Sequence, residues 1–537
     1  MDVQRIILAV IFSFSSLMLW QSWQKFNIPA STAEVVVHQT EPGKSSIQQA
    51  EVIRQENLLQ QGSVVSIQTD TLQAQINTLG GDVQQIALLN YHDLQHKNVP
   101  LMLLQDTATN KFVAQSGLLG NQLPTHKSLF QAKAKNYVLM KGQTELVVPL
   151  YWDDVATGIQ VEKDYVFYPD SYRIDVRWIV HTPHPLTEPI EAYFQFVRDG
   201  KAPIGESKVV HTFTGPAFYT QASKFKKVSF ESLNKHEQQI PPAANNGWVA
   251  IVQHHFVSAW LPKNGEHREF YAKALGNGLY KAGVLLSGNK ISSNTVWQMD
   301  VPLYVGPQIQ KTLAGLAPGL TYVVDYGWLT PIAVPLFWVL QKTEEITGNW
   351  GWAIIILTIL IKLAFFPLSA KSYRSMAQMK QLTPKLQQLK TVYGDDREKL
   401  HHAMMELYKT EKVNPLGGCL PTVVQIPVFI ALYWTLVGSV EMRQAPFIGW
   451  IHDLSAPDPY YVLPILMGLT MLLQTRLNPA PPDPMQAKVM MVMPVAFTVF
   501  FLFFPSGLVL YWVVSNIMSM SQQWVITRQM GKKTVRG

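Results

Sequence analysis

Hydrophobic residues are distributed along this chain in two different patterns. From about residue 57 to 320, apolar and polar positions alternate in short runs such as YRIDVRWIVHT and NTVWQMDVPLYVG, separated by Gly, Pro and Asn. Alternation with a period of two is typical of half-buried β-strands, so this part is predicted to be a large all-β sandwich. From about residue 350, long apolar runs with few charges predict helices that span a lipid bilayer.

Five such spans are expected in the second part of the chain. The first three lie at about 350–370, 417–437 and 459–477. The run from Val489 to Thr527 is uncharged, and one helix of that length would measure about 58 Å, far more than a bilayer core of ~30 Å. The turn Phe504–Gly507 is expected to divide it into two spans.

The N-terminus holds one more apolar segment, IILAVIFSFSSLMLW, directly after Arg5. Its length suits an uncleaved membrane anchor, whereas Ser31 and Ala33 resemble a weak cleavage site of a signal peptide. Both interpretations require export of the domain that follows, and the downstream spans favour the anchor. The chain is thus predicted to be a polytopic α-helical membrane protein with six spans and both termini in the cytoplasm.

The remaining segments complete the expected organisation. A polar stretch without aromatic residues is expected to be a flexible linker. An apolar stretch interrupted by Pro331 and Pro335 is expected to be an interfacial amphipathic helix, with a re-entrant segment as the alternative. The expected parts are the anchor at 1–26, the linker at 27–56, the β domain at 57–320, the interfacial helix at 321–346, a five-helix membrane core at 347–527 and a basic tail at 528–537.

Positive charge is concentrated in the loop 371–416 and in the tail, although the whole chain has a net charge of only +7. The positive-inside rule places both in the cytoplasm and the β domain on the opposite side of the membrane. Apolar residues at helical spacing predict a helical hairpin in this loop. Residues 394–396 are expected to supply a turn and the N-cap of the second helix, and Thr383 is expected to be the N-cap of the first. The hairpin either connects two spans or offers a docking surface to ribosomes or anionic lipid.

The β domain offers little recognisable chemistry. His254 and His255 are adjacent on a predicted strand and should point to opposite faces. A sugar-active sandwich would need a histidine and a carboxylate in one cleft, which the sequence leaves open. The single cysteine, Cys419, excludes an internal disulfide and is interpreted as a small buried residue. There is no GxxxxGK[ST] loop, so no nucleotide is expected, and neither is a cofactor, a metal or a catalytic residue.

Lys362 is the most informative residue, because it is the only charge within WGWAIIILTILIKLAFFP, residues 350–367. A charge inside a span costs ~2.5–3.5 kcal/mol on insertion scales and therefore suggests a function. No Asp or Glu lies within the expected spans to pair with it. We therefore predict a hydrated cavity inside the membrane. The alternative is that Lys362 snorkels to the cytoplasmic interface, helped by a bend at Pro367.

Three expected spans carry polar residues at helical spacing, so that the residues of each span share one face. If the three polar faces converge, they would line one cavity. The alternative is that these residues make ordinary hydrogen bonds between helices. The residues are Thr358 with Lys362, Thr422 with Gln425, and Trp512, Ser515, Asn516 and Ser519.

Three stretches, KVNPLGGCLPTVVQIPVFIALYW, GSVEMRQAPFIGWIHDLSAPDPYYVLPILMG and FFPSGLVLYWVVSN, resemble the Gram-negative branch of the YidC insertase family, which also includes mitochondrial and chloroplast insertases. The resemblance covers essentially the whole chain. It implies a β-supersandwich outside the inner membrane and a hydrophilic groove that is open to cytoplasm and lipid. It also implies nascent membrane proteins as substrates, with the ribosome and the Sec translocon as partners.

Within this resemblance, Lys362 occupies the place of the positive groove residue, which is arginine in many relatives. The charge is retained but bidentate recognition of a carboxylate is not. Thr358, Gln425 and Trp512 match other groove positions, the last often a tyrosine elsewhere. The expected function is that of an insertase and chaperone, acting alone or with the Sec translocon.

Three other functions compete with this one. A secondary transporter usually relies on intramembrane carboxylates, which the spans lack. A membrane-anchored sugar-active enzyme is the second alternative, and turnover of a sugar by the isolated β domain would support it. A passive assembly scaffold is the third alternative; unlike an insertase, it would not insert a substrate into liposomes by itself.

Overall fold

The structure is a computed structural model in which residues 62–93, 98–120, 122–186, 188–203, 213–237, 239–288, 290–292, 295–394, 396–411, 413–414, 420–478 and 484–534 are described. The expected anchor at 1–26, the linker at 27–56 and the burial of Cys419 lie outside the described residues.

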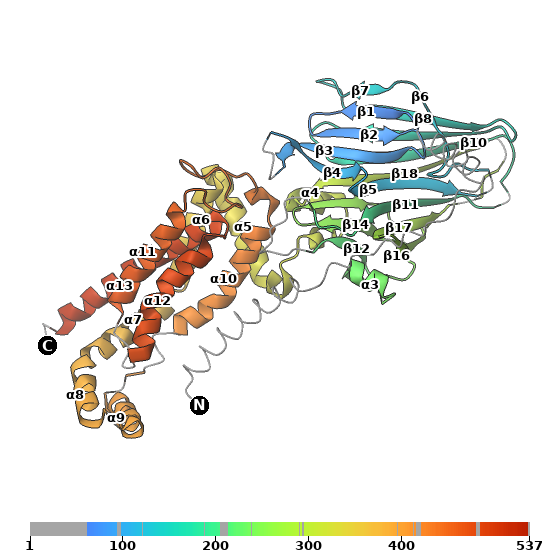
Figure 1. The fold of residues 1–537 in the computed structure, drawn as a ribbon. Helices are drawn as coiled ribbons and strands as arrows, with labels where there is room; N and C mark the ends of the chain where they lie inside the picture. The colour runs from blue at the N-terminus through green and yellow to red at the C-terminus, as the bar shows by residue number, and fades with distance from the viewer. Residues whose placement is uncertain are drawn as a thin grey trace, which may run out of the picture. The chain divides into compact units, whose positions relative to one another are not determined.

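Two sheets, each with nine strands among the described residues, form the β domain (Figure 1). Neighbouring strands are antiparallel except β1 and β7, which run parallel. The first sheet has the order β16 (Arg268–Gly276), β17 (Leu279–Ser287), β11 (Glu191–Asp199), β5 (Lys111–Leu119), β4 (Pro100–Asp106), β3 (Asp82–His92), β2 (Leu72–Asn77), β1 (Val64–Gln68), β7 (Asn136–Val138). The second has the order β13 (Lys224–Lys227), β12 (Gly215–Thr220), β14 (Trp248–Gln253), β15 (Phe256–Trp260), β18 (Thr295–Pro307), β10 (Arg173–Thr182), β9 (Ile159–Phe167), β8 (Leu146–Asp154), β6 (Gln131–Ala132).

The alternating pattern of the sequence produces the core between the sheets. Along β10, Ile174, Val176 and Trp178 are buried while the residues between them are partly exposed. Aromatic pairs join the two sheets, as in Phe194 of β11 and Trp260 of β15, whose ring centroids are 5.1 Å apart. The prediction of an all-β sandwich is confirmed.

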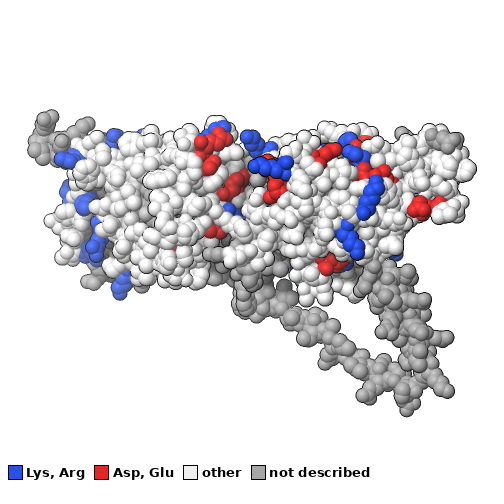
Figure 2. Space-filling view, turned by 90° about the horizontal axis from the view of Figure 1, so that it is seen from above, with Lys and Arg blue, Asp and Glu red and all other residues white. Residues whose placement is uncertain are grey.

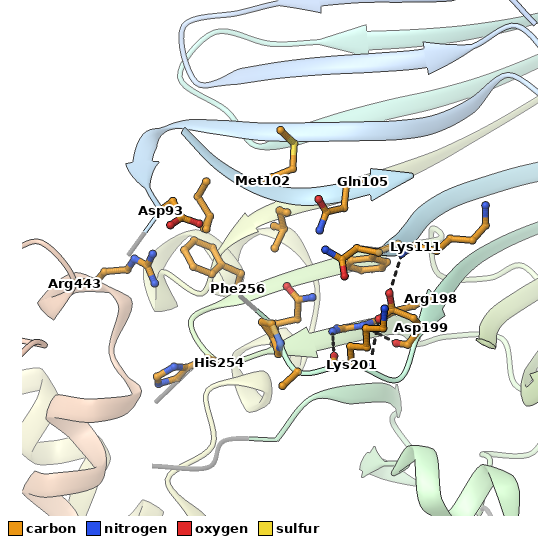
Figure 3. A pocket seen from close by; sticks show the side chains of 17 residues that line it. Asp93, Met102, Gln105, Lys111, Arg198, Asp199, Lys201, His254, Phe256 and Arg443 are labelled. Atoms are coloured by element: carbon orange, nitrogen blue, oxygen red, sulfur yellow. Dashed lines mark hydrogen bonds between the residues drawn. The ribbon is translucent and has the colours of Figure 1, made fainter. Parts of the chain in front are cut away.

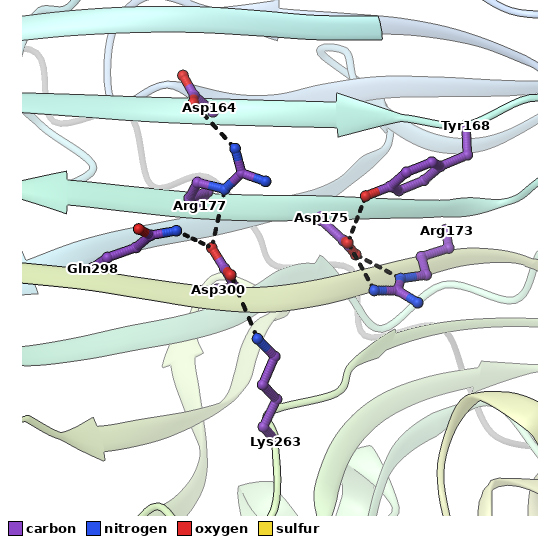
Figure 4. A network of polar contacts seen from close by, with 8 residues as sticks. All are labelled: Asp164, Tyr168, Arg173, Asp175, Arg177, Lys263, Gln298 and Asp300. Carbon is purple, nitrogen blue, oxygen red and sulfur yellow. Dashed lines mark hydrogen bonds and ion pairs between the residues drawn. The ribbon is translucent and has the colours of Figure 1, made fainter. Parts of the chain in front are cut away.

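The outward face of β10 carries cross-strand charge pairs (Figure 4). Arg177 lies opposite both Asp164 on β9 and Asp300 on β18. Its guanidinium approaches Asp164 at 3.9 Å and Asp300 at 3.2 Å. Opposite charges at facing positions each contribute roughly 0.2–1 kcal/mol to pairing, so this network helps to set the register of three strands.

Helices follow the sandwich (Figure 1). They are α4 (Gln310–Leu316), α5 (Thr330–Thr347), α6 (Trp350–Ala364), α7 (Phe366–Gln381), α8 (Thr383–Tyr393), α9 (Arg397–Thr410), α10 (Leu420–Gly438), α11 (Val462–Leu477), α12 (Pro484–Phe501) and α13 (Ser506–Thr534), and a short helix, α3 (Phe230–Asn234), lies in the β domain. The helices α5, α6, α10, α11, α12 and α13 share one apolar core. A small cluster of Leu382, Tyr408 and Val413 packs α8 against α9.

Taken singly, none of the described helices combines the length and the apolar composition needed to cross a membrane. One bent pair, α6 with α7, meets both conditions together, with an angle of 66° between its halves. Three shorter apolar helical segments also occur, at Val423–Gly438, Val462–Leu477 and Lys488–Phe501. The six spans of the sequence analysis therefore stay a prediction.

Several element boundaries differ from those expected. The first expected span does not continue to residue 370, because α6 ends at Ala364 and a new helix begins with Pro367 in its first turn. Proline lacks the N–H that a continuing helix needs, and its ring clashes with the preceding turn. Thr383 begins α8 instead of capping it, whereas Asp396 caps α9 as predicted by accepting a hydrogen bond from the Lys399 N–H.

The last expected boundary also moves. The helix α13 continues to Thr534, so most of the basic segment that was expected to be a separate tail is helical.

Candidate functional site

Lys362 lies in the last turn of α6 and is only 7% exposed. Its ammonium donates hydrogen bonds to Gln425 Oε1 at 3.2 Å and to Ser519 Oγ at 2.9 Å. These acceptors come from α10 and α13, so three helices that are far apart in the sequence meet at one cation. The ammonium therefore points into the helix assembly and not out toward the following basic loop.

The surroundings of this ammonium are neutral dipoles. Among the described residues, no carboxylate lies within ion-pair distance of Lys362, which agrees with the absence of acids from the apolar runs. Gln425 donates in turn from Nε2 to the Tyr511 hydroxyl, 3.3 Å away. Amide and hydroxyl groups can stabilise a cation but leave its charge uncompensated. The site can therefore attract an anion.

Thr358 lies one turn before Lys362 on the same face of α6 and is fully buried. Its hydroxyl donates to the main-chain oxygen of Ile354, 2.6 Å away, and is thus satisfied within its own helix. Thr422, the other threonine of the expected polar faces, has a side chain outside the described residues.

The polar residues of α13 do not all face Lys362. Ser515 is buried and lies within hydrogen-bond distance of Tyr511, whereas Asn516 donates from Nδ2 to Thr470 Oγ1 on α11 at 3.1 Å. Trp512 packs edge-on against the rings of Phe429 and Phe501, with centroids 5.0 and 5.8 Å away. Asn516 therefore makes the hydrogen bond between helices that the sequence allowed as its alternative role.

Gln522 belongs to the site but was not among the expected residues. Its Nε2 donates to the main-chain oxygen of Lys362 at 3.1 Å, and it is 6% exposed. Gln522 follows Ser519 by three residues and extends the same helix face. Continuing the polar stripe by one step would have identified it.

The model of the 60Kd inner membrane protein family matches residues 342–533, which include the entire Lys362 site. The model of the YidC periplasmic domain matches residues 64–339, which include the sandwich. A membrane protein insertase YidC from Thiobacillus denitrificans is 52% identical over 98% of both chains. The chain belongs to the YidC family. Another relative with the same name, from Methylobacillus flagellatus, is 51% identical over 98% of this chain and 97% of its own.

A solved structure titled as an active YidC insertase with its first transmembrane domain resolved is also similar. It is 17% identical, with a TM-score of 0.41, and the alignment covers 88% of this chain and 96% of that chain.

In this YidC family member, the sandwich contacts the end of α10 through two histidines. His254 and His255 both bond through Nε2 to the main-chain oxygen of Val437, at 3.2 and 2.8 Å. Their rings stack with centroids 3.8 Å apart. The prediction that they point to opposite faces is wrong, because they form the turn between β14 and β15 and alternation applies only within a strand.

A cavity of about 100 Å³ lies beside this contact (Figure 3). Its lining mixes positive and negative side chains, with Arg198 and Lys201 on one side and Arg443, which follows α10, on the other. The guanidinium of Arg443 donates to the main-chain oxygen of His92 at 2.9 Å and lies 5.3 Å from the Phe256 ring centroid. Arg443 therefore ties the loop after α10 to the sandwich.

The charged side chains are unevenly distributed over the visible face (Figure 2). Lysine and arginine are the visible charges at the end of the molecule with α8, α9 and the end of α13, whereas Asp and Glu gather nearer the sandwich. Among the residues that the structure describes, no group of three or more His, Cys, Asp or Glu is placed to hold a metal ion.

Proposed function

We propose that this protein is a membrane-protein insertase and chaperone that transfers hydrophobic segments of newly made proteins into the inner membrane. The observation that supports this most directly is the buried ammonium of Lys362, held by Gln425 and Ser519 without a carboxylate partner among the described residues. The names of the relatives, which match over almost their full length, support the same function.

The proposed mechanism is electrostatic and needs no nucleotide, cofactor or covalent step. The polar faces of α6, α10 and α13 form a hydrated groove that shortens the apolar distance a substrate's polar tail must cross. Lys362 attracts acidic residues of that tail, because a cation in a narrow groove between apolar helix walls interacts more strongly with an opposite charge than it would in bulk water. The apolar outer faces of the helices then release the hydrophobic segment into lipid.

The proposed topology assigns the remaining parts. The anchor at 1–26 and the five spans within 347–527 lie in the inner membrane, with both termini in the cytoplasm and the sandwich in the periplasm. The hairpin of α8 and α9 with the basic end of α13 then faces the cytoplasm, where its lysines suit ribosomal RNA or anionic lipid. Cooperation with the Sec translocon belongs to the same proposal.

The decisive experiment changes the charge of Lys362 and measures insertion into liposomes that contain only this protein. The substrate is a labelled single-span protein with a short acidic exported tail. Lys362→Glu should abolish its insertion, whereas Lys362→Arg should retain it. Lys371→Glu is the matched control, because it makes the same charge change at an exposed position of α7.

Two outcomes would contradict the proposal. Full activity of the Lys362→Glu protein would show that the positive charge of Lys362 is not needed for insertion. Failure of the wild-type protein to insert any single-span substrate on its own would instead favour an assembly scaffold.

A further inference from the structure

Two residues of α13 hold Lys362 at its two ends. Ser519 accepts a hydrogen bond from the ammonium at 2.9 Å, and Gln522 donates one to the main-chain oxygen of the same lysine at 3.1 Å. Residues three apart on a helix share a face, so α13 presents both groups side by side. Gln425, by contrast, accepts from the ammonium of Lys362 and makes no hydrogen bond to its main chain.

The end of α6 explains why the main-chain oxygen needs a partner. The helix ends at Ala364 and the chain bends by 66° into α7. The last four carbonyl groups of a helix lack the donors of a following turn. Gln522 supplies a side-chain donor to one of them, the oxygen of Lys362 itself, and so ties the bend to α13.

The side chain of lysine makes this second contact important. It is long and flexible, and in a membrane protein it tends to extend toward the nearest polar interface. The basic segment of α7 begins only nine residues later, at Lys371. Without the second contact, the carbonyl of Lys362 would lack a donor at the bend, and the end of α6 could shift and turn the charge outward.

We propose that Gln522 is a positioning residue that fixes the end of α6 and thereby aims the ammonium of Lys362 into the substrate site. This inference rests on the proposed function, in which that charge attracts acidic substrate tails. In this proposal, Gln522 affects insertion only by positioning Lys362.

The adjacent Gln523 provides a matched control. The two amides are almost equally buried, with exposed fractions of 6% and 7%, and each has a buried Oε1 without a partner among the described residues. Gln523 points to the end of α11, where its Nε2 lies 3.3 Å from Asn478 Oδ1. A general loss of packing should therefore affect Gln522→Leu and Gln523→Leu alike.

The test is a double-mutant cycle in the liposome assay with the acidic-tailed substrate. Gln522→Leu should slow insertion about tenfold, which corresponds to ~1.4 kcal/mol of lost interaction. Gln523→Leu should slow it less than about twofold. Adding Gln522→Leu to Lys362→Gln should cause no further loss, because the charge that Gln522 aims is already absent. Additive losses, or equal losses in the Gln522 and Gln523 variants, would overturn the proposal.

A second readout separates this inference from the proposed function. In vesicles, a water-soluble, amine-reactive reagent should label Lys362 at least about threefold faster in Gln522→Leu than in the wild type, because the released side chain is more exposed to water. The labelling rate should stay unchanged in Gln523→Leu. If Lys362→Gln inserts normally while labelling rises, the proposed function fails and the positioning role stands. Unchanged labelling contradicts positioning whatever the insertion result. If Gln522→Leu does not fold, Gln522→Asn, which is one methylene shorter, serves in both assays.

Discussion

His255 donates a hydrogen bond from Nε2 to the main-chain oxygen of Val437 at 2.8 Å, so a turn of the sandwich caps the last turn of α10. A carbonyl can only accept, and the proton of the neutral ring is therefore on Nε2. Nδ1 is buried without a partner among the described residues, so a second proton on Nδ1 would have no acceptor there.

This contact should make stability depend on pH. Burial, followed by the neighbouring His254, lowers the pKa of His255 well below 6.5. The unfolded chain then binds the proton first, so stability is complete above pH ~6.5 and is lost as the pH falls below it. The thermal unfolding midpoint in detergent should drop between pH 7 and 5.

Replacing this histidine removes the titrating group. His255→Gln should flatten that dependence and, because one hydrogen bond is weakened, lower the stability at pH 7.5 by about 1 kcal/mol. The exposed His181 is the control, since His181→Gln should leave the slope unchanged. An unaltered slope in His255→Gln would show that other groups cause the pH dependence.

Glu441 should produce a pH dependence of the opposite sign. Burial raises its pKa to about 7, although a backbone hydrogen bond from Gln310 opposes the shift. The folded protein therefore keeps the proton longer than the unfolded chain, and stability falls as the pH rises from about 4.5 to 7.

A neutral amide at this position avoids that loss. Glu441→Gln should be more stable than the wild type at pH 8, by about 3 kcal/mol, and about equally stable near pH 4.5. Unfolding in urea at the two pH values measures the difference, with the exposed Glu406→Gln as the control. Equal stabilisation at both pH values would point to packing instead of charge.

The contact between α11 and α12 depends on the absence of a side chain at Gly468. A Cβ at this position would overlap Thr498 Oγ1. Gly468→Ala should destabilise the protein by roughly 1–3 kcal/mol, as overpacked sites do. Adding Thr498→Ala should restore part of this stability, because it removes the overlapping oxygen. Thermal unfolding of the single and double variants checks the coupling, and simple additivity would argue against direct contact.

Asn516 should affect stability without affecting the charge response of the site. Its hydrogen bond to Thr470 joins α13 to α11, away from Lys362. Asn516→Ala and Thr470→Ala should show a coupling of about 0.6 kcal/mol, typical of hydrogen bonds between membrane helices. The ratio of insertion of acidic-tailed to neutral-tailed substrates should stay at the wild-type value. A changed ratio would instead indicate that Asn516 lines the substrate groove.

Much of the fold could be predicted because its signals are local. The alternation in β10 places Ile174 and Val176 in the core without knowledge of any other strand. The interruption of the first helix follows from Pro367, and the N-cap at Asp396 is a property of a few neighbouring residues. The strand order, in which β18 lies between β15 and β10, depends on contacts between distant residues and has no comparable signal.

The candidate site shows the same division. Spacing on one helix put Lys362 and Thr358 on one face, but spacing could not say which of the polar residues on α13 would meet them. Ser519 does so and Asn516 turns to α11, although both belong to the same stripe. The stacked pair His254 and His255 was missed because a tight turn interrupts what looks like one continuous strand.

The sequence by itself determined where polar groups occur along each helix and strand, since repeat length and the placement of proline act over a few residues. Only the tertiary structure decided which of those groups share a partner, as when Gln425, Ser519 and Gln522 gather around one lysine. The reason is physical: a side chain's direction follows from its own backbone, whereas its contacts depend on how helices distant in the chain rotate and pack to bury their apolar faces.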